Sequence, residues 1–301
     1  MNTKPELKLI LCCISMAMVA GCGGGGGGYG GGVASPSTSS NYLSTFLNKP
    51  NVTGSATADV RRVQRTMNGF QEVSMSDATT ATDSIKITFG SDSNLSNVTF
   101  SNSVSFGTFE RQGRTGRTIH TAESGANSMT INSVSSYMDY GDWAVRSGDI
   151  FTQSYFVSGY ETPSSNIPTV GDLYYIGHAQ GIASKPSAPS SDNTFVVDSN
   201  VQITADMAAK NVGLNFTANS VTNISNPTSV GSVPTAIDDY KITGSGTFAG
   251  NAIAGGLILT SSGQRGVFTG KFYGPSAENI GGTFTFSGTD LKYTGSFGAY
   301  K

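Results

Sequence analysis

One short segment gathers the residues best suited to binding chemistry. Residues 110–120, ERQGRTGRTIH, place Arg111, Arg114 and Arg117 three residues apart and end in His120. A neutral imidazole is a common axial ligand of haem iron, and arginines pair readily with carboxylates such as the haem propionates. The pattern therefore makes haem a candidate ligand, with His120 on the iron. A solvated hairpin loop, or a basic patch for an acidic partner surface, is the alternative.

Three further side chains are candidates for the same site. Tyr137, Tyr140 and Met129 follow His120 closely enough in the chain to lie near it in a small β domain. The other histidine, His178, stands between two small residues in an expected strand, which favours a place in a barrel wall or at its rim. Haem is thus a candidate ligand, and the sequence requires no resident cofactor.

No motif predicts catalysis or a metal site. The chain lacks GxSxG, HExxH and CxxC, and GVFTGKF at 266–272 lacks the spacing of a phosphate-binding loop. The paired acids Asp139 and Asp142, and Asp238 and Asp239, are typical of solvated turns. A net charge of -2 also offers no general footprint for nucleic acid. We therefore expect a protein that is not an enzyme and does not bind nucleic acid.

The first residues have the layout of an export signal. Lys4 and Lys8 precede an apolar run that ends in Val-Ala-Gly-Cys at Cys22. This end is similar to the lipobox of bacterial lipoproteins, in which the cysteine carries the lipid. We expect residues 1–21 to be a lipoprotein signal peptide, with Cys22 lipidated. An ordinary secretory signal is the alternative. Residues 22–41, rich in Gly, Ser and Pro, are typical of a flexible tether.

The remaining chain is typical of an all-β protein. It is rich in Gly and has only 13% charged residues, without a long helical period. Residues 42–165 are irregular and predict a handle-like β domain. Residues 59–72 fit either a strand or a short helix.

Residues 166–301 have a regular alternation that predicts an eight-stranded, antiparallel, up-and-down barrel. A membrane-spanning barrel is the alternative, but the outward positions are mostly Thr, Ser and Lys and show no aromatic girdle. We therefore expect a soluble barrel. The expected strands are Tyr174–Ala183, Asn200–Asp206, Asn211–Thr222, Tyr240–Phe248, Ala252–Thr260, Arg265–Tyr273, Ile280–Ser287 and Leu291–Ala299.

Several segments resemble transferrin-binding protein B and related surface lipoproteins. FYGPSAENIGGTF (272–284) and YTGSFGAYK (293–301) resemble the end of that family's barrel, although Tyr300 is an insertion. YMDYGDWAV (137–145) resembles the strand before the barrel, and IPTVGDLYYIGHAQG (167–181) resembles the barrel's entry. VQITADM (201–207) resembles a strand that ends in Ala-Asp-Phe in the family, with Met in place of Phe.

The resemblance implies one lobe, a handle followed by a barrel, on a lipoprotein at the outer membrane of a Gram-negative bacterium. It implies that the chain binds a host iron- or haem-carrier protein and passes the ligand to a TonB-dependent outer-membrane receptor. The membrane would be reached through the lipid anchor. The alternative is a host-interaction lipoprotein without a transport role, an adhesin or a binder of a complement regulator such as factor H. A fold shared by such tasks does not choose among them.

Two long connections are candidate contact surfaces for a protein partner. Residues 223–239 contain two prolines and are long for a barrel connection, and residues 185–193 form another such segment. Long loops in compact domains are often functional, but either segment can be a plain connection.

Overall fold

The computed structural model describes residues 53–68, 71–89, 95–100, 106, 110–114, 117–124, 127–188, 193–225 and 237–301. The signal segment, Cys22 and the tether lie outside these residues, as do most of the two long connections. The regular secondary structure of the described residues consists of strands and of short 3-10 turns at η2 (Ser164–Asn166) and η4 (Asp238–Tyr240). No helix in this part of the chain is long and apolar enough to cross a membrane.

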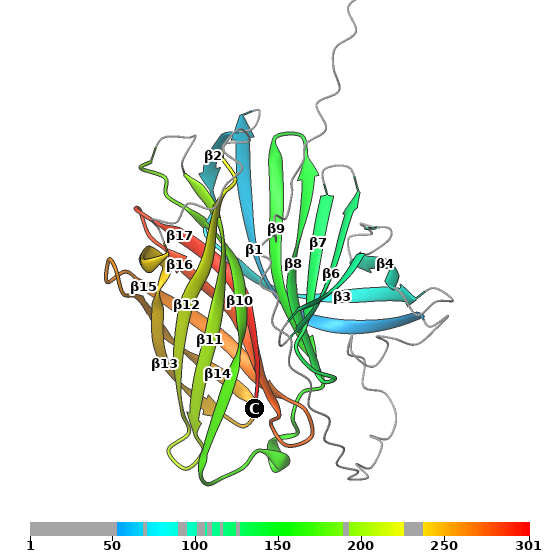
Figure 1. The fold of residues 1–301 in the computed structure, drawn as a ribbon, viewed down its shortest axis with the longest axis vertical. Helices are drawn as coiled ribbons and strands as arrows, with labels where there is room; N and C mark the ends of the chain where they lie inside the picture. The colour runs from blue at the N-terminus through cyan, green and yellow to red at the C-terminus, as the bar shows by residue number, and fades with distance from the viewer. Residues whose placement is uncertain are drawn as a thin grey trace, which may run out of the picture. The chain divides into compact units, whose positions relative to one another are not determined.

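The N-terminal strands form one antiparallel sheet, in the order β4-β3-β1-β9-β8-β7-β6-β5, with β2 paired to β1 (Figure 1). Residues 59–72, which the sequence left open, lie in the long strand β1 and at the start of β2. The strands are β1 (Thr53–Asn68), β2 (Gln71–Met75), β3 (Thr79–Phe89), β4 (Leu95–Phe100), β5 (Glu110–Arg114), β6 (Arg117–Ser124), β7 (Asn127–Ser133), β8 (Met138–Ser147) and β9 (Ile150–Gly159).

The C-terminal strands β10 to β17 form a closed antiparallel barrel in chain order. This confirms the predicted all-β fold and its eight-stranded barrel. The strands are β10 (Asp172–Ser184), β11 (Thr194–Asp206), β12 (Asn211–Asn223), β13 (Ile242–Ala249), β14 (Ala252–Leu259), β15 (Arg265–Tyr273), β16 (Asn279–Ser287) and β17 (Lys292–Tyr300).

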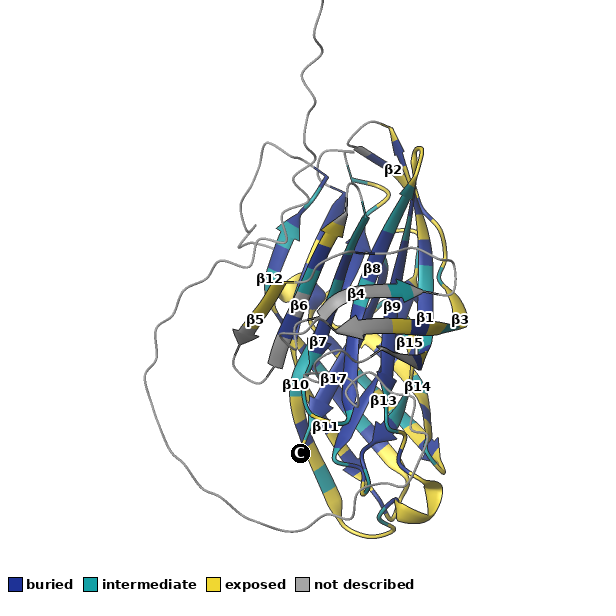
Figure 2. Ribbon diagram, turned by 90° about the vertical axis from the view of Figure 1, so that its right-hand side faces the viewer, coloured by how far each residue is buried: buried dark blue, intermediate teal, exposed yellow. Residues whose placement is uncertain are grey.

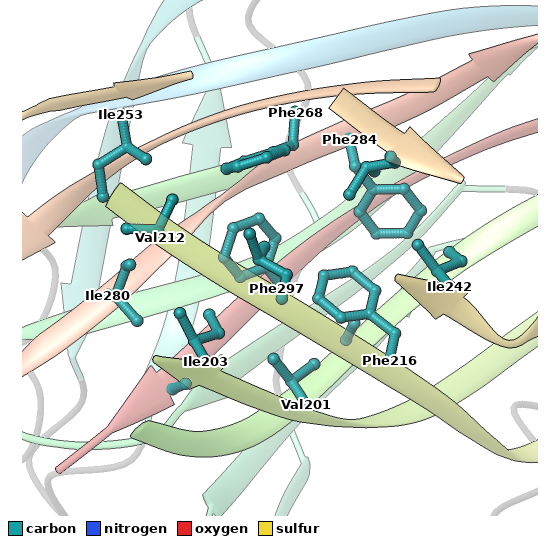
Figure 3. Packing of buried hydrophobic residues seen from close by; sticks show 14 of the residues in the cluster. Val201, Ile203, Val212, Phe216, Ile242, Ile253, Phe268, Ile280, Phe284 and Phe297 are labelled. Atoms are coloured by element: carbon teal, nitrogen blue, oxygen red, sulfur yellow. The ribbon is translucent and has the colours of Figure 1, made fainter. Parts of the chain in front are cut away.

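Side chains fill the barrel interior. Buried and exposed positions alternate along most of its strands, as expected when one face of a strand points inward (Figure 2). At the centre, the ring of Phe216 lies 5.5 Å from that of Phe284 and 5.4 Å from that of Phe297 (Figure 3). Tilted and edge-to-face contacts of this kind are the favoured geometry of aromatic pairs. The barrel therefore has a packed aromatic core.

Strands β16 and β17 do not alternate, because both of their faces are buried. Their outward residues lie against the sheet, where Ser296 Oγ donates a hydrogen bond of 2.9 Å to the carbonyl oxygen of Gly141 in β8. Arg61 of β1 is also buried here and donates to the hydroxyls of Thr283 and Thr269, at 3.3 and 3.4 Å. Sheet and barrel thus belong to one compact unit.

The Gly-Pro interruption in the C-terminal part is the turn between β15 and β16. Gly274 has φ of +92°, in the region that favours glycine. The carboxylate of Glu278 accepts the backbone N–H of Ser276 at 2.8 Å and closes the turn. Of the two glycines that follow, Gly281 faces Met138 of the sheet and Gly282 faces the barrel interior under Phe297. Both positions lack space for a side chain.

The segment that resembles the strand before the barrel, 137–145, lies in and just before β8. Strand β9 stands between this segment and β10. Segment 137–145 nevertheless contacts the barrel, because its Tyr140 packs with Val157 and with Tyr273 of β15. The resemblance therefore marks a strand that touches the barrel and is not adjacent to it in the chain.

Candidate functional site

The arginine and histidine segment forms the β5–β6 hairpin at one edge of the sheet. Arg114 and Arg117 pair across its turn, and Arg111 pairs with His120. His120 therefore lies within a strand, three residues from the turn, and not in a loop. The side chain of Arg111 is exposed. For Arg114, Arg117 and His120 the described structure is that of the backbone.

The other haem candidates lie on different faces of the sheet. Met129 is buried in a cluster with Trp143 and Phe156. Tyr140 is buried in a separate cluster against the barrel, with Tyr273. Tyr137 precedes β8 and is partly exposed. The structure thus does not bring Met129 and Tyr140 together.

The pairing of β6, β7 and β8 also places the backbone of His120 in a different row from Tyr140. His120 pairs with Ile131, which pairs with Gly141, whereas Tyr140 pairs with Asn132 in the next row. Neighbouring rows point to opposite faces of a sheet. Ligation of haem iron by His120 stays a prediction. His178 lies in the barrel wall, in β10 between Asn200 and Gly298.

The described ends of the two long connections are joined to each other. Ser225 Oγ accepts the backbone N–H of Asn193 at 3.1 Å, and Lys185 Nζ forms an ion pair of 3.2 Å with Asp239. Residues 189–192 and 226–236 lie outside the described part. Because their flanking residues are in contact, both connections start and finish at the same end of the barrel.

A third element that sequence reasoning missed completes this end. Asn193 Nδ2 donates to the carbonyl oxygen of Glu72 in β2 at 2.9 Å, and Lys292 Nζ donates to that of Met75 at 2.8 Å. The β1–β2 hairpin therefore lies beside the barrel connections. The Asn-Gly step at residues 68–69 is a strong hairpin signal and could have revealed it. We call this region, defined by residues 65–68 and 71–75 of β1–β2 and by residues 185–188, 193, 225 and 237–239, the loop end.

Aromatic and basic side chains pack against one another at the loop end. Lys185 Nζ lies 5.6 Å from the ring centre of Phe195 and 5.5 Å from that of Tyr240. Burial, followed by the nearby charge of Asp239, raises the pKa of Tyr240, so its hydroxyl stays neutral. These groups are suited to non-covalent recognition. The described residues contain no cluster of three metal-ligating side chains.

Comparison with known proteins shows what the barrel is similar to. Residues 167–301 match the family model described as the C-lobe and N-lobe β-barrels of transferrin-binding protein B. Among curated proteins, none matches the chain.

Solved structures of low identity also match. A double mutant of transferrin-binding protein B from Haemophilus parasuis Hp5 is 18% identical, with a TM-score of 0.48, over 80% of this chain and 44% of that chain. A mutant from Actinobacillus pleuropneumoniae H49 is 14% identical, with a TM-score of 0.46, over 81% of this chain and 99% of that one. The N-lobe of lactoferrin-binding protein B from Moraxella bovis is 11% identical, with a TM-score of 0.38, over 80% and 98%.

The chain thus spans less than half of the Haemophilus parasuis protein. The family match, in contrast, covers the complete set of barrel strands from β10 to β17. Residues 167–301 are therefore similar to the β-barrels of transferrin-binding protein B.

Proposed function

We propose that this chain is a surface lipoprotein that binds a host iron-carrier protein, of the transferrin or lactoferrin class, in iron acquisition. The observation that carries the proposal is the match of residues 167–301 to the barrels of transferrin-binding protein B. The expected signal peptide at residues 1–21, followed by Cys22, supports a lipid anchor in the outer membrane, with the protein facing outward. A TonB-dependent receptor would then receive the ligand.

The loop end is the surface that we assign to the carrier protein. Three hairpins or connections meet there, and loops carried on a rigid scaffold are where binding residues concentrate. Lys185 and Asp239 are partly exposed at this end, with side-chain exposures of 32% and 51%. They can exchange their mutual ion pair for contacts with a partner. The expected interaction is therefore reversible recognition, without covalent chemistry.

A capture experiment tests the partner. The full chain is immobilised and exposed separately to iron-loaded transferrin, lactoferrin, haemoglobin and factor H. We expect retention of transferrin or lactoferrin, released by competing free carrier. Retention of factor H alone would overturn the proposal in favour of the complement-regulator alternative. Retention of none of the four would also count against it.

A matched pair of variants tests the surface. Lys185→Gln removes a charge at the loop end, and we expect it to weaken carrier binding several-fold through loss of rim electrostatics. Lys210→Gln removes a charge from the turn between β11 and β12, at the opposite end of the barrel, and should leave the dissociation constant unchanged. Titration calorimetry measures both. Equal losses in the two variants would contradict the assignment.

Haem remains a second candidate ligand, favoured by the Arg111, Arg114, Arg117 and His120 pattern on paired strands. Haemin is added to the purified chain and the Soret band recorded. Binding through His120 predicts a shifted band that His120→Ala abolishes. A band that is unshifted, or unchanged in the variant, rejects this ligand and leaves the carrier proposal standing.

A further inference from the structure

One carboxylate of the sheet lies at its contact with the first barrel strand. Asp142 of β8 accepts a hydrogen bond of 2.5 Å from Gln153 Nε2 of β9 and another from Gln180 Nε2 of β10. Gln180 Oε1 in turn accepts from Asn132 Nδ2 of β7 at 2.7 Å. Asp142 therefore links β8 and β9 of the sheet to the first barrel strand, and Asn132 of β7 contacts the same glutamine of that strand.

Apolar contacts flank this polar group on two sides. One cluster joins Val63, Met75 and Tyr155 of the sheet to Ile182 of the barrel. The other joins Met138, Tyr140 and Val157 to Tyr273. Asp142 itself is half-buried beside these clusters, so its carboxyl is partly withdrawn from water, where an uncompensated charge is costly.

The groups around Asp142 do not neutralise a negative charge. Asp198 of β11, which pairs with Gln180, adds repulsion. Tyr155 of β9 is a neutral phenol beside the carboxyl, Arg65 of β1 is already paired with Glu72, and His178 lies two residues before Gln180 in β10. Among the described residues, Asp142 forms no ion pair. Burial, with a smaller contribution from Asp198, raises its pKa to about 7, against the opposing hydrogen bonds of Gln153 and Gln180.

We propose that Asp142 is a pH-responsive latch, which holds the sheet on the barrel when neutral and weakens that contact when ionised. If the two parts separate, the carboxyl is solvated and ionises near its ordinary pKa of 3.8. Its pKa is higher in the closed state, so proton binding favours closure. The contribution is complete below about pH 4, falls as the pH rises through 7 and is absent above it.

The hydrogen bonds show how the latch changes state. The ionised carboxylate accepts two amide N–H groups, as in the structure. A neutral acid must donate its own proton, so one amide has to present its oxygen instead. Asn132 holds Gln180 in its orientation, which leaves Gln153 as the side chain that turns over. The two protonation states therefore have two distinct arrangements.

Distance measurement between spin labels tests the latch. In the full chain, with Cys12, Cys13 and Cys22 changed to Ser, labels are placed on Glu123→Cys in β6 and Gln202→Cys in β11, both exposed sites. We expect the distance distribution to broaden as the pH rises from 4 to 8, with the change complete near pH 7. The same distribution at every pH would overturn the proposal.

Two variants test whether the pH-dependent broadening arises from the Asp142 carboxyl. Asp142→Asn, which resembles the neutral acid, should keep one narrow distribution across the range, and an unchanged transition in this variant rejects the latch. Asp198→Asn removes repulsion and should move the midpoint to lower pH. If Asp142→Asn fails to fold, Asp198→Asn carries the test, since a midpoint that stays in place or rises contradicts the proposal.

Discussion

Among the described residues, the Arg65–Glu72 ion pair is the most deeply buried charge pair at the loop end. Arg65 Nε lies 2.6 Å from Glu72 Oε2, and the two side chains are 7% and 0% exposed. The guanidinium also lies over the ring of Phe151, 5.8 Å from its centre. A buried pair of this kind contributes little net energy when intact, but removing one member leaves a buried charge without compensation. Its geometry therefore makes the hairpin sensitive to single substitutions.

Glu72→Gln is expected to lower the free energy of unfolding by about 3–5 kcal/mol, because Arg65 keeps its charge and loses its counter-charge. Asp83→Asn is the matched control. Asp83 pairs with Arg62, also on β1, but those side chains are 30% and 16% exposed, so the cost should stay below about 1 kcal/mol. Urea unfolding followed by circular dichroism measures both. A similar loss of unfolding free energy in the two variants would show that burial of the ion pair does not determine the cost of breaking it.

At the scale of the element, β16 depends on close backbone approach. A Cβ at Gly282 would lie 2.1 Å from the carbonyl oxygen of Thr269 and 2.8 Å from the Cα of Gly270. A Cβ at Gly256, in β14, would meet nothing closer than 4.0 Å. The paired glycines of β16 are therefore required by packing, whereas an exposed glycine in the same barrel is not.

Gly282→Ala is expected to destabilise the chain by about 1–3 kcal/mol or more, because the backbone of β15 has to move. Gly256→Ala should be neutral or stabilising by about 0.4–1 kcal/mol, since alanine reduces the entropy of the unfolded chain. Thermal unfolding distinguishes the two. A drop in Tm for Gly256→Ala as large as that for Gly282→Ala would contradict the packing argument.

The elements also show what the sequence could predict. All eight barrel strands were predicted, because hydrophobic alternation and Gly-containing turns are local signals. The packing of Tyr140 against the barrel was not predicted, since contacts between strands that are distant in the sequence leave no local pattern. For the same reason Asp142, interpreted as a solvated turn residue, proved to be a contact between sheet and barrel. Of the candidate site, the two long connections were identified from length alone, but their meeting with β1–β2 depends on tertiary structure.

At the scale of the whole molecule, the outward residues of β16 and β17 that lie against the sheet are mostly small and polar. The outward residues of β16 and β17 include Thr283, Thr285, Thr294 and Ser296, with few large apolar groups such as Tyr273 beside them. A surface of this composition tolerates exposure to water. The barrel therefore has its own complete core and a modest dependence on the sheet.

Residues 167–301 alone are accordingly expected to fold, with the far-UV spectrum of a β protein and a cooperative transition. The Tm should be lower than that of the full chain, because Ile182 and Tyr273 lose their apolar partners in the sheet. Circular dichroism with a thermal scan measures both properties. A barrel fragment that shows no cooperative transition would mean that the sheet is required for folding.

Trp143 makes the folding of the sheet visible by fluorescence. It is the single tryptophan of the chain and is 1% exposed, packed against Phe156 in the core of the sheet. The barrel, with its many tyrosines and phenylalanines, contains no indole. Tryptophan emission therefore reports the sheet alone, whereas tyrosine absorbance is dominated by neither part. The protein carries an intrinsic optical label that can show which half loses its structure first.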